Sequence, residues 1–167
     1  MELTTQLDLS LNMAESSTLD FGSPTSRVAY SKSISLATGT GLNQADLRWS
    51  DQRTLTQNTN EDIDVVGALT GALGTTLSLA KLKMIVLYSL STNVVNLTIS
   101  RPATNGVPFL AAASDAFVLV PGGLFVFVNP SLAAVTCTAG TADLINIAAA
   151  AGAADAVYDI HIVGTSA

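Results

Sequence analysis

The chain changes character after Arg101, because no lysine or arginine follows that residue. The acidic and imidazole groups in this part are Asp115, Asp143, Asp155, Asp159 and His161. Its apolar segments are short and are interrupted by glycine and proline, so none approaches the roughly 18 residues of a membrane-spanning helix. A stretch this poor in charge is expected to bury its faces against protein, either within one domain or between subunits.

Alternating segments predict how that burial is achieved. Val95, Leu97 and Ile99 alternate with polar residues, and the same period of two recurs around Tyr158 and Ile160. This period indicates strands with one buried face. About eight such segments, separated by turn signals, predict an all-β antiparallel sandwich of the jelly-roll type. The alanine-rich run 148–154 is interpreted as a loop because strand-like runs bound it and Gly152 interrupts it.

Two apolar runs on either side of Pro121-Gly122-Gly123 predict a hairpin over residues 117–128. Both faces of this hairpin are apolar, so we expect the opposite sheet or an identical subunit to cover it. Its large side chains are the candidate oligomer interface: Phe117, Leu119, Phe125 and Phe127.

The N-terminal segment is polar and irregular. Residues 1–26 are predicted to form an extended arm, and residues 27–167 a single sandwich domain whose first strand spans 27–36. Leu7, Leu9 and Leu11 recur at alternate positions in the arm. We expect these leucines to contact a partner, because an extended segment of this kind can add a strand to a neighbouring sheet.

A polar region in the middle of the chain contains Arg48, Trp49 and Arg53. In one interpretation it is a binding loop anchored by the indole, since tryptophan and arginine are enriched at the energetic centres of interfaces. In the other, the arginines pair with local aspartates and Trp49 covers the edge of the core. The three residues are therefore candidate partner contacts.

Several classes of function lack support in the sequence. The net charge is −6, which disfavours nucleic-acid binding, and the N-terminus lacks the basic and apolar regions of a signal peptide, which indicates synthesis in a cytoplasm. Cys137 is interpreted as a small buried residue, and His161 has no recognisable metal-binding or nucleophilic companions. We therefore predict no catalytic site, no metal and no cofactor.

Several segments resemble small virion proteins of tailed bacteriophages, namely 39–46, 51–55, 61–65, 69–74, 121–124, 138–143 and 158–160. The resemblance implies a capsid decoration or cement protein. Such a protein would be a homotrimer on the outer capsid surface, bound to the major capsid protein at inter-subunit junctions, without nucleic acid or membrane as a partner. The alternative within the same class is a head-fibre, tail or receptor- or glycan-binding component of the virion.

Overall fold

The computed structural model describes residues 2–167, which contain β-strands and no helix. The strands are β1 (Thr5–Ser16), β2 (Thr25–Thr38), β3 (Gln44–Ala45), β4 (Leu47–Leu55), β5 (Asn60–Asp64), β6 (Val66–Thr70), β7 (Thr76–Ser78), β8 (Lys81–Ser89), β9 (Leu97–Ser100), β10 (Ala116–Leu119), β11 (Leu124–Val128), β12 (Val135–Thr136), β13 (Leu144–Ala149) and β14 (Ala156–Thr165). The run 148–154 ends β13 and continues as a loop, as predicted.

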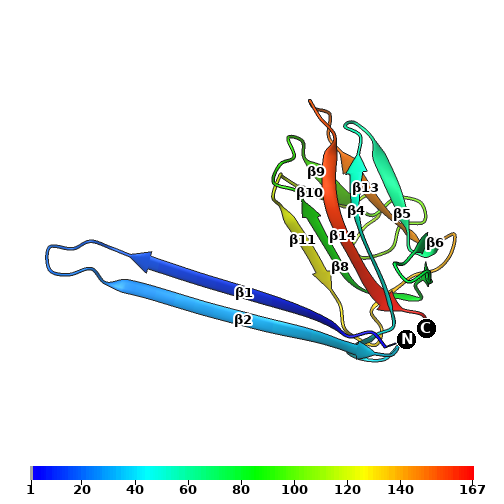
Figure 1. Ribbon diagram of the computed structural model, residues 1–167, viewed down its shortest axis with the longest axis horizontal. Coiled ribbons are helices and arrows are strands. Elements are labelled where there is room, and N and C mark those ends of the chain that lie inside the picture. Colours follow the sequence, from blue (N-terminus) through cyan, green and yellow to red (C-terminus); the bar gives the residue numbers. More distant parts are fainter. Residues whose placement is uncertain (1) are drawn as a thin grey trace.

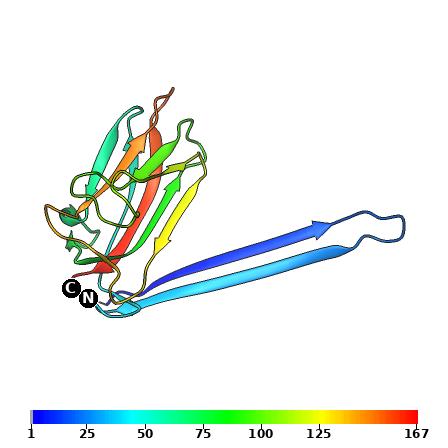
Figure 2. The ribbon, with the colours of Figure 1, turned by 180° about the vertical axis from the view of Figure 1, so that it is seen from behind.

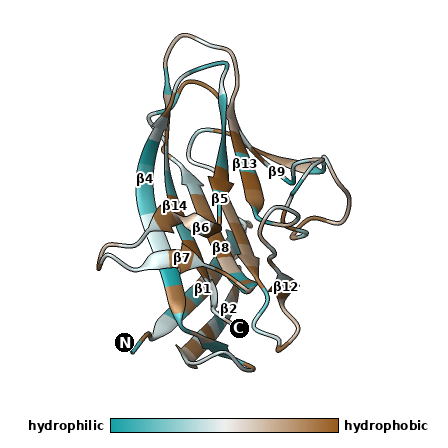
Figure 3. Ribbon diagram, turned by 90° about the vertical axis from the view of Figure 1, so that its right-hand side faces the viewer, coloured by the Kyte–Doolittle hydropathy of each residue, from teal (hydrophilic) through white to brown (hydrophobic). Residues whose placement is uncertain are grey.

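Two antiparallel sheets form the body of the molecule (Figure 1). One has the strand order β11-β8-β14-β4, with β12 also paired to β8, and the other has the order β10-β9-β13-β5. Their inner faces share one hydrophobic core, to which Ile85 and Ile160 contribute from the first sheet and Ile99 and Ile147 from the second. Hydrophobic segments on β5 and β13 and a hydrophilic stretch of β4 are visible in Figure 3. The prediction of an all-β antiparallel sandwich is confirmed.

The predicted hairpin over 117–128 is wrong. β10 pairs with β9 at the edge of one sheet, and β11 pairs with β8 at the edge of the other, so the glycine turn between them crosses from sheet to sheet. Leu119 is buried, and Phe125 and Phe127 pack edge-on against Phe109, each at 6.3 Å between ring centroids. Phe117 remains half-exposed beside Phe125. A short turn between two apolar strands is compatible both with a hairpin within one sheet and with a crossing between two sheets, so the sequence alone does not distinguish them.

The N-terminal arm is a long two-stranded ribbon that projects from the base of the sandwich (Figures 1 and 2). β1 pairs with β2 along its whole length, from Thr5 opposite Leu36 to Ser16 opposite Thr25. The boundary predicted between residues 26 and 27 therefore falls inside β2, and the strand expected over 27–36 belongs to the arm. Its alternation marks one apolar face correctly but does not reveal what that face covers.

A polar network joins the two sheets near the other end of the sandwich. The Glu61 carboxylate accepts a hydrogen bond from the buried Tyr158 hydroxyl at 2.6 Å, and from Arg53 Nε at 2.9 Å and Nη2 at 2.5 Å. Asp51 adds a more exposed ion pair to Arg53 at 3.2 Å. Desolvation, followed by the hydrogen bond to Glu61, raises the pKa of Tyr158, while Glu61 raises the pKa of Arg53. Glu61 thus satisfies two groups that are costly to leave unpaired.

We expect Glu61→Ala to reduce the free energy of unfolding by about 2–4 kcal/mol, because it leaves a buried hydroxyl and a partly buried guanidinium without an acceptor. Asp51→Ala is the matched control, since it removes the exposed partner of the same arginine and should cost less than about 1 kcal/mol. Urea denaturation of both variants measures the difference. Equal losses would contradict the assignment of Glu61 as the central acceptor.

Candidate functional site: an amphipathic ribbon and the sheet face at its base

The two faces of the ribbon differ in chemistry. Residues directly opposite each other in an antiparallel pair lie on the same face, so the β1–β2 register decides which side chains share a side. One side, here called the apolar ribbon face, carries Leu7, Leu9, Leu11, Met13, Val28, Tyr30, Ile34 and Leu36. The opposite side carries mainly Ser, Asn, Asp and Gln, for example Asp8 opposite Ser33 and Ser10 opposite Ser31. The ribbon is therefore amphipathic from Leu7 to Met13, with Lys32 opposite Leu9 as the one charged group on this side, and the side turns polar where Glu15 lies opposite Ser26.

The base of the apolar ribbon face packs against the body. Leu36 is fully buried in a cluster with Met84 and Val163, and Leu7 is half-buried beside it. Met84 and Val163 are paired neighbours on β8 and β14, on the side of the five-stranded sheet that faces away from the main core. The ribbon therefore docks its apolar side onto the outer face of this sheet.

Hydrogen bonds fix the base in place. The Thr38 hydroxyl accepts from the Leu3 amide at 2.7 Å and donates to the Leu3 carbonyl at 2.8 Å. Lys83 is fully buried, and its ammonium donates to the carbonyl of Gly41 at 3.3 Å and to that of Ser131. Burial lowers the pKa of this ammonium, with Lys81 adding a smaller repulsion. The Thr38 bonds join the two strands at the base of the ribbon, and the Lys83 bonds tie the loop that follows the ribbon to the body.

Beyond its base the apolar ribbon face is bare. Leu9, Leu11, Met13, Val28 and Tyr30 each expose between 48% and 58% of their surface, and Phe21 at the tip is 99% exposed. An isolated two-stranded hairpin is at best marginally stable in water. Large exposed apolar surfaces are typical of interaction sites. The apolar ribbon face is therefore the candidate surface for a partner.

A second exposed apolar strip lies on the outer face of the sheet at the foot of the ribbon. The register places Val126 beside Val86 and Leu124 beside Tyr88, and these four residues are here called the β8–β11 strip. Leu124 and Val126 are 56% and 42% exposed, and Val86 and Tyr88 are partly buried.

On β14 and β4 the same sheet face turns polar. Asp159 and His161 continue the rows of the strip on β14, with Gln52 and Ser50 beyond them on β4. The apolar strip is therefore confined to β8 and β11.

The predicted partner contacts separate into two groups. Leu7, Leu9 and Leu11 all lie on the apolar ribbon face, where the structure brings them together. Trp49 lies instead on β4, inside the core, with 5% of its surface exposed. Arg48 points outward from the same strand, and Arg53 is held by Glu61. The local interpretation of this region, with Trp49 covering the core, matches the structure, although the region is a strand and not a loop.

Sequence reasoning missed the β2 half of the apolar ribbon face. Val28, Tyr30 and Ile34 alternate with polar residues at the same period as the leucines of β1. That matching period was the available signal for a hairpin between the two segments. The polar residues 17–24 between the two segments separate them in the sequence, and the prediction therefore places 27–36 in the sandwich.

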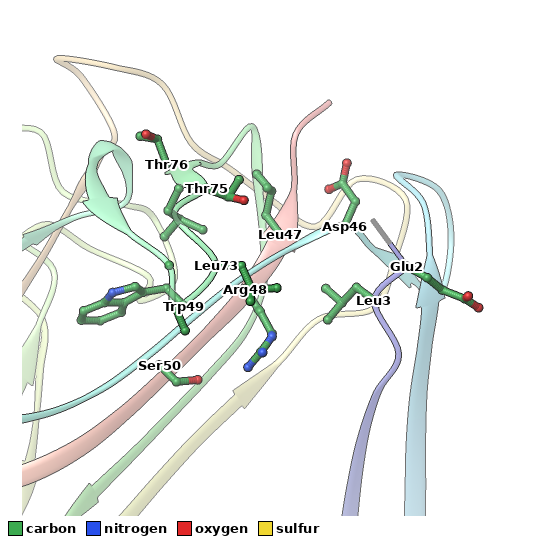
Figure 4. Close-up of a pocket in the computed structure, with 13 residues that line it drawn as sticks. Glu2, Leu3, Asp46, Leu47, Arg48, Trp49, Ser50, Leu73, Thr75 and Thr76 are labelled. Atoms are coloured by element: carbon green, nitrogen blue, oxygen red, sulfur yellow. The ribbon is translucent and has the colours of Figure 1, made fainter.

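A shallow hollow of about 140 Å³ lies where β4 meets the N-terminus and the loop before β7 (Figure 4). Arg48, Leu3 and Leu73 are among the side chains around it. Asp46, also in its lining, accepts hydrogen bonds from the amide of Ser166 at 2.8 Å and from its hydroxyl at 2.5 Å. The described lining contains no histidine or cysteine.

Other chemically versatile groups are held by structural neighbours. His161 Nδ1 is 3.0 Å from Ser50 Oγ, and Asp159 accepts from Gln52 Nε2 at 2.8 Å. Within residues 2–167, no three His, Cys, Asp or Glu side chains are grouped so as to hold a metal ion. Over the same range, no helix has the length and apolar character needed to cross a membrane.

Comparisons with protein-family models, with curated protein sequences and with solved structures give no match for this chain. The surface chemistry of the ribbon and of the β8–β11 strip is therefore what bears on function.

Cys137 provides a test of the packing beside this sheet. Burial raises the pKa of its thiol to about 12, so the reactive thiolate is scarce in the folded protein. We expect a disulfide-exchange reagent at pH 8 to modify Cys137 at least about 100-fold more slowly in native protein than in urea. Stability should also fall as the pH rises from about 9 toward 12, because only the unfolded chain then ionises its thiol. Rapid modification of native protein would contradict this placement.

Proposed function

We propose that this chain is a non-enzymatic structural protein of a phage virion, which decorates and stabilises the capsid shell by binding the major capsid protein at inter-subunit junctions. The observation that carries the proposal is the anchored ribbon, which projects from the sandwich and exposes Leu19 and Phe21 at its tip. A projecting amphipathic ribbon suits a protein whose role is to attach to an assembly. The resemblance of the sequence to small virion proteins supplies the identity of that assembly.

The strand order supports the jelly-roll form of the sandwich. If the strands of the two body sheets are numbered along the chain, omitting β12 and the small β6–β7 hairpin, the sheets read 1-8-3-6 and 2-7-4-5. This is the order produced by rolling paired antiparallel strands into two packed sheets, as in capsid jelly rolls. Because unrelated functions share this fold, it supports the proposal without identifying the partner.

The dimensions and charge of the chain fit attachment to an outer shell. A strand of 12 residues such as β1 extends roughly 40 Å at 3.3 Å per residue. The ribbon therefore carries Leu19 and Phe21 at its tip well beyond the sandwich, where they can insert into a junction between capsid subunits. The net charge of −6 disfavours binding to packaged DNA.

The rival assignment is a head-fibre, tail or receptor-binding component. A glycan-binding role loses its strongest stacking platform, because the single tryptophan of the chain is buried in the core. The number of copies in purified virions separates the remaining assignments. Decoration requires copies in numbers comparable to the major capsid protein, whereas a handful of copies would overturn the proposal in favour of a tail or fibre part.

We expect Phe21→Ser to weaken binding to expanded capsid shells about 10- to 100-fold, because an exposed aromatic anchor of this kind commonly dominates an interface. Asp20→Ser, at the neighbouring position of the tip, should bind as the parent does. Co-sedimentation of purified protein with shells that lack it measures both affinities. No binding of the parent protein to shells, or equal binding by the two variants, would contradict a tip that anchors in the shell.

A further inference from the structure

We infer that the bare part of the apolar ribbon face is covered by a second copy of this chain, with the ribbon of one copy lying across the β8–β11 strip of the next. This inference deepens the proposed structural role and rests on its premise that the ribbon acts between chains. It assigns the shaft of the ribbon to contacts between copies, and leaves the tip free to meet the shell.

A smaller contact of the same kind, between the apolar ribbon face and the outer face of the five-stranded sheet, is present within each chain. At the base of the ribbon, Leu7 and Leu36 pack onto the cluster that contains Met84 and Val163, with Val86 and Val128 beside it. On β11, the strip extends this sheet surface from Val128 to Val126 and then to Leu124, each paired with β8. The apolar ribbon face and the apolar sheet face therefore meet at the base of the ribbon, and each extends beyond that contact as an exposed surface.

A chain cannot complete this contact with its own ribbon. The packing of Leu36 holds the base of the ribbon on the sheet, and the Lys83 ammonium ties the following loop to the body. From there the ribbon leads away from the sandwich on the side of β11, as both views show (Figures 1 and 2). Each copy thus presents one uncovered ribbon face and one uncovered strip, which is the pairing required for exchange between neighbours.

Charge supports the same pairing. Lys32 lies in the middle of the apolar ribbon face, opposite Leu9. Asp159 borders the β8–β11 strip, paired across the sheet with Tyr88. A ribbon laid across the strip brings a basic group toward this acidic one, so the contact has a complementary pair at its margin.

The area available reaches the lower end of specific interfaces. The bare part of the ribbon, from Leu9 to Ser16, is about 26 Å long and about 10 Å wide, so one face offers roughly 260 Å². Two copies that exchange ribbons would bury two ribbon faces and two matching areas of sheet, roughly 1,000 Å² in total. Because the ribbon and the strip differ, each single contact is heterologous.

Cross-linking between separately mutated copies tests this arrangement in the absence of shells. Leu11→Cys is placed in one preparation and Val126→Cys in another, both with Cys137→Ser, and the two are mixed under mild oxidation. A disulfide between the two variants can form only between copies. Ser10→Cys, on the polar side of the ribbon, is the matched control. We expect the Leu11/Val126 product to form at least about tenfold faster than the Ser10/Val126 product.

Two outcomes would overturn the inference. Faster linkage of Leu11→Cys to itself would show that ribbons cover each other, and equal linkage by the Leu11 and Ser10 variants would show that no specific contact is made. Light scattering supplies a second readout, in which the parent is an oligomer and Leu9→Ser/Leu11→Ser/Tyr30→Ser is a monomer. Asp8→Ser/Asn12→Ser, on the polar side, should remain an oligomer.

The near-ultraviolet circular dichroism of buried Trp49 confirms that each variant retains its sandwich. A parent protein that is monomeric yet binds shells would overturn this inference and leave the proposed function standing. An oligomer that does not bind shells would support this inference and overturn the proposed function.

Discussion

The packing of Leu36 onto the outer face of the five-stranded sheet is the interaction on which the rest of the arrangement depends. It lies where the ribbon joins the sandwich, and the buried Lys83 ammonium holds the adjoining loop through the carbonyls of Gly41 and Ser131. A charged group buried against carbonyls alone is costly to desolvate. Its carbonyl acceptors come from the loop after the ribbon and the loop after β11, so the ammonium joins these two loops at the base of the ribbon.

With its base fixed, the ribbon leaves most of its apolar face exposed to water. The sandwich buries its own core between two sheets and needs no further cover. The ribbon does not, because its apolar face is packed only at Leu7, Ile34 and Leu36 and is half-exposed from Leu9 onward. Two strands cannot bury a face of their own, so the free energy of covering it would be released only on association. Under the proposed role, assembly supplies that cover.

The sequence was sufficient for the fold class and for part of the surface. The alternation around Ile99 and Ile160 reports which side of a strand is buried, and the structure places those side chains in the core. The leucines of the arm were identified for the same reason. Alternation shows that one side of a strand is apolar, but it does not show which other strands or sheets cover that side. The prediction therefore places β2 in the sandwich, whereas it belongs to the ribbon.

Two other errors have related causes. The sequence predicts a hairpin at the turn between β10 and β11, but a short glycine turn can either reverse a strand within one sheet or connect two sheets. The polar neighbours of Trp49 are compatible with a surface anchor, and they do not indicate that its side chain faces inward on β4. In each case the deciding contact comes from residues distant in the chain, such as Phe109 against Phe127.

Amide hydrogen exchange of the ribbon, compared between dilute free protein and purified virions, tests the central claim most directly. Beyond the packed base, backbone amides of β1 and β2 should exchange close to the unprotected rate in protein diluted until it is monomeric, since a bare ribbon opens at little cost. In the virion they should be protected at least about 100-fold, while amides of β8 and β14 change little. Ribbon amides that exchange equally fast in both states would contradict the claim that another protein surface covers the apolar ribbon face.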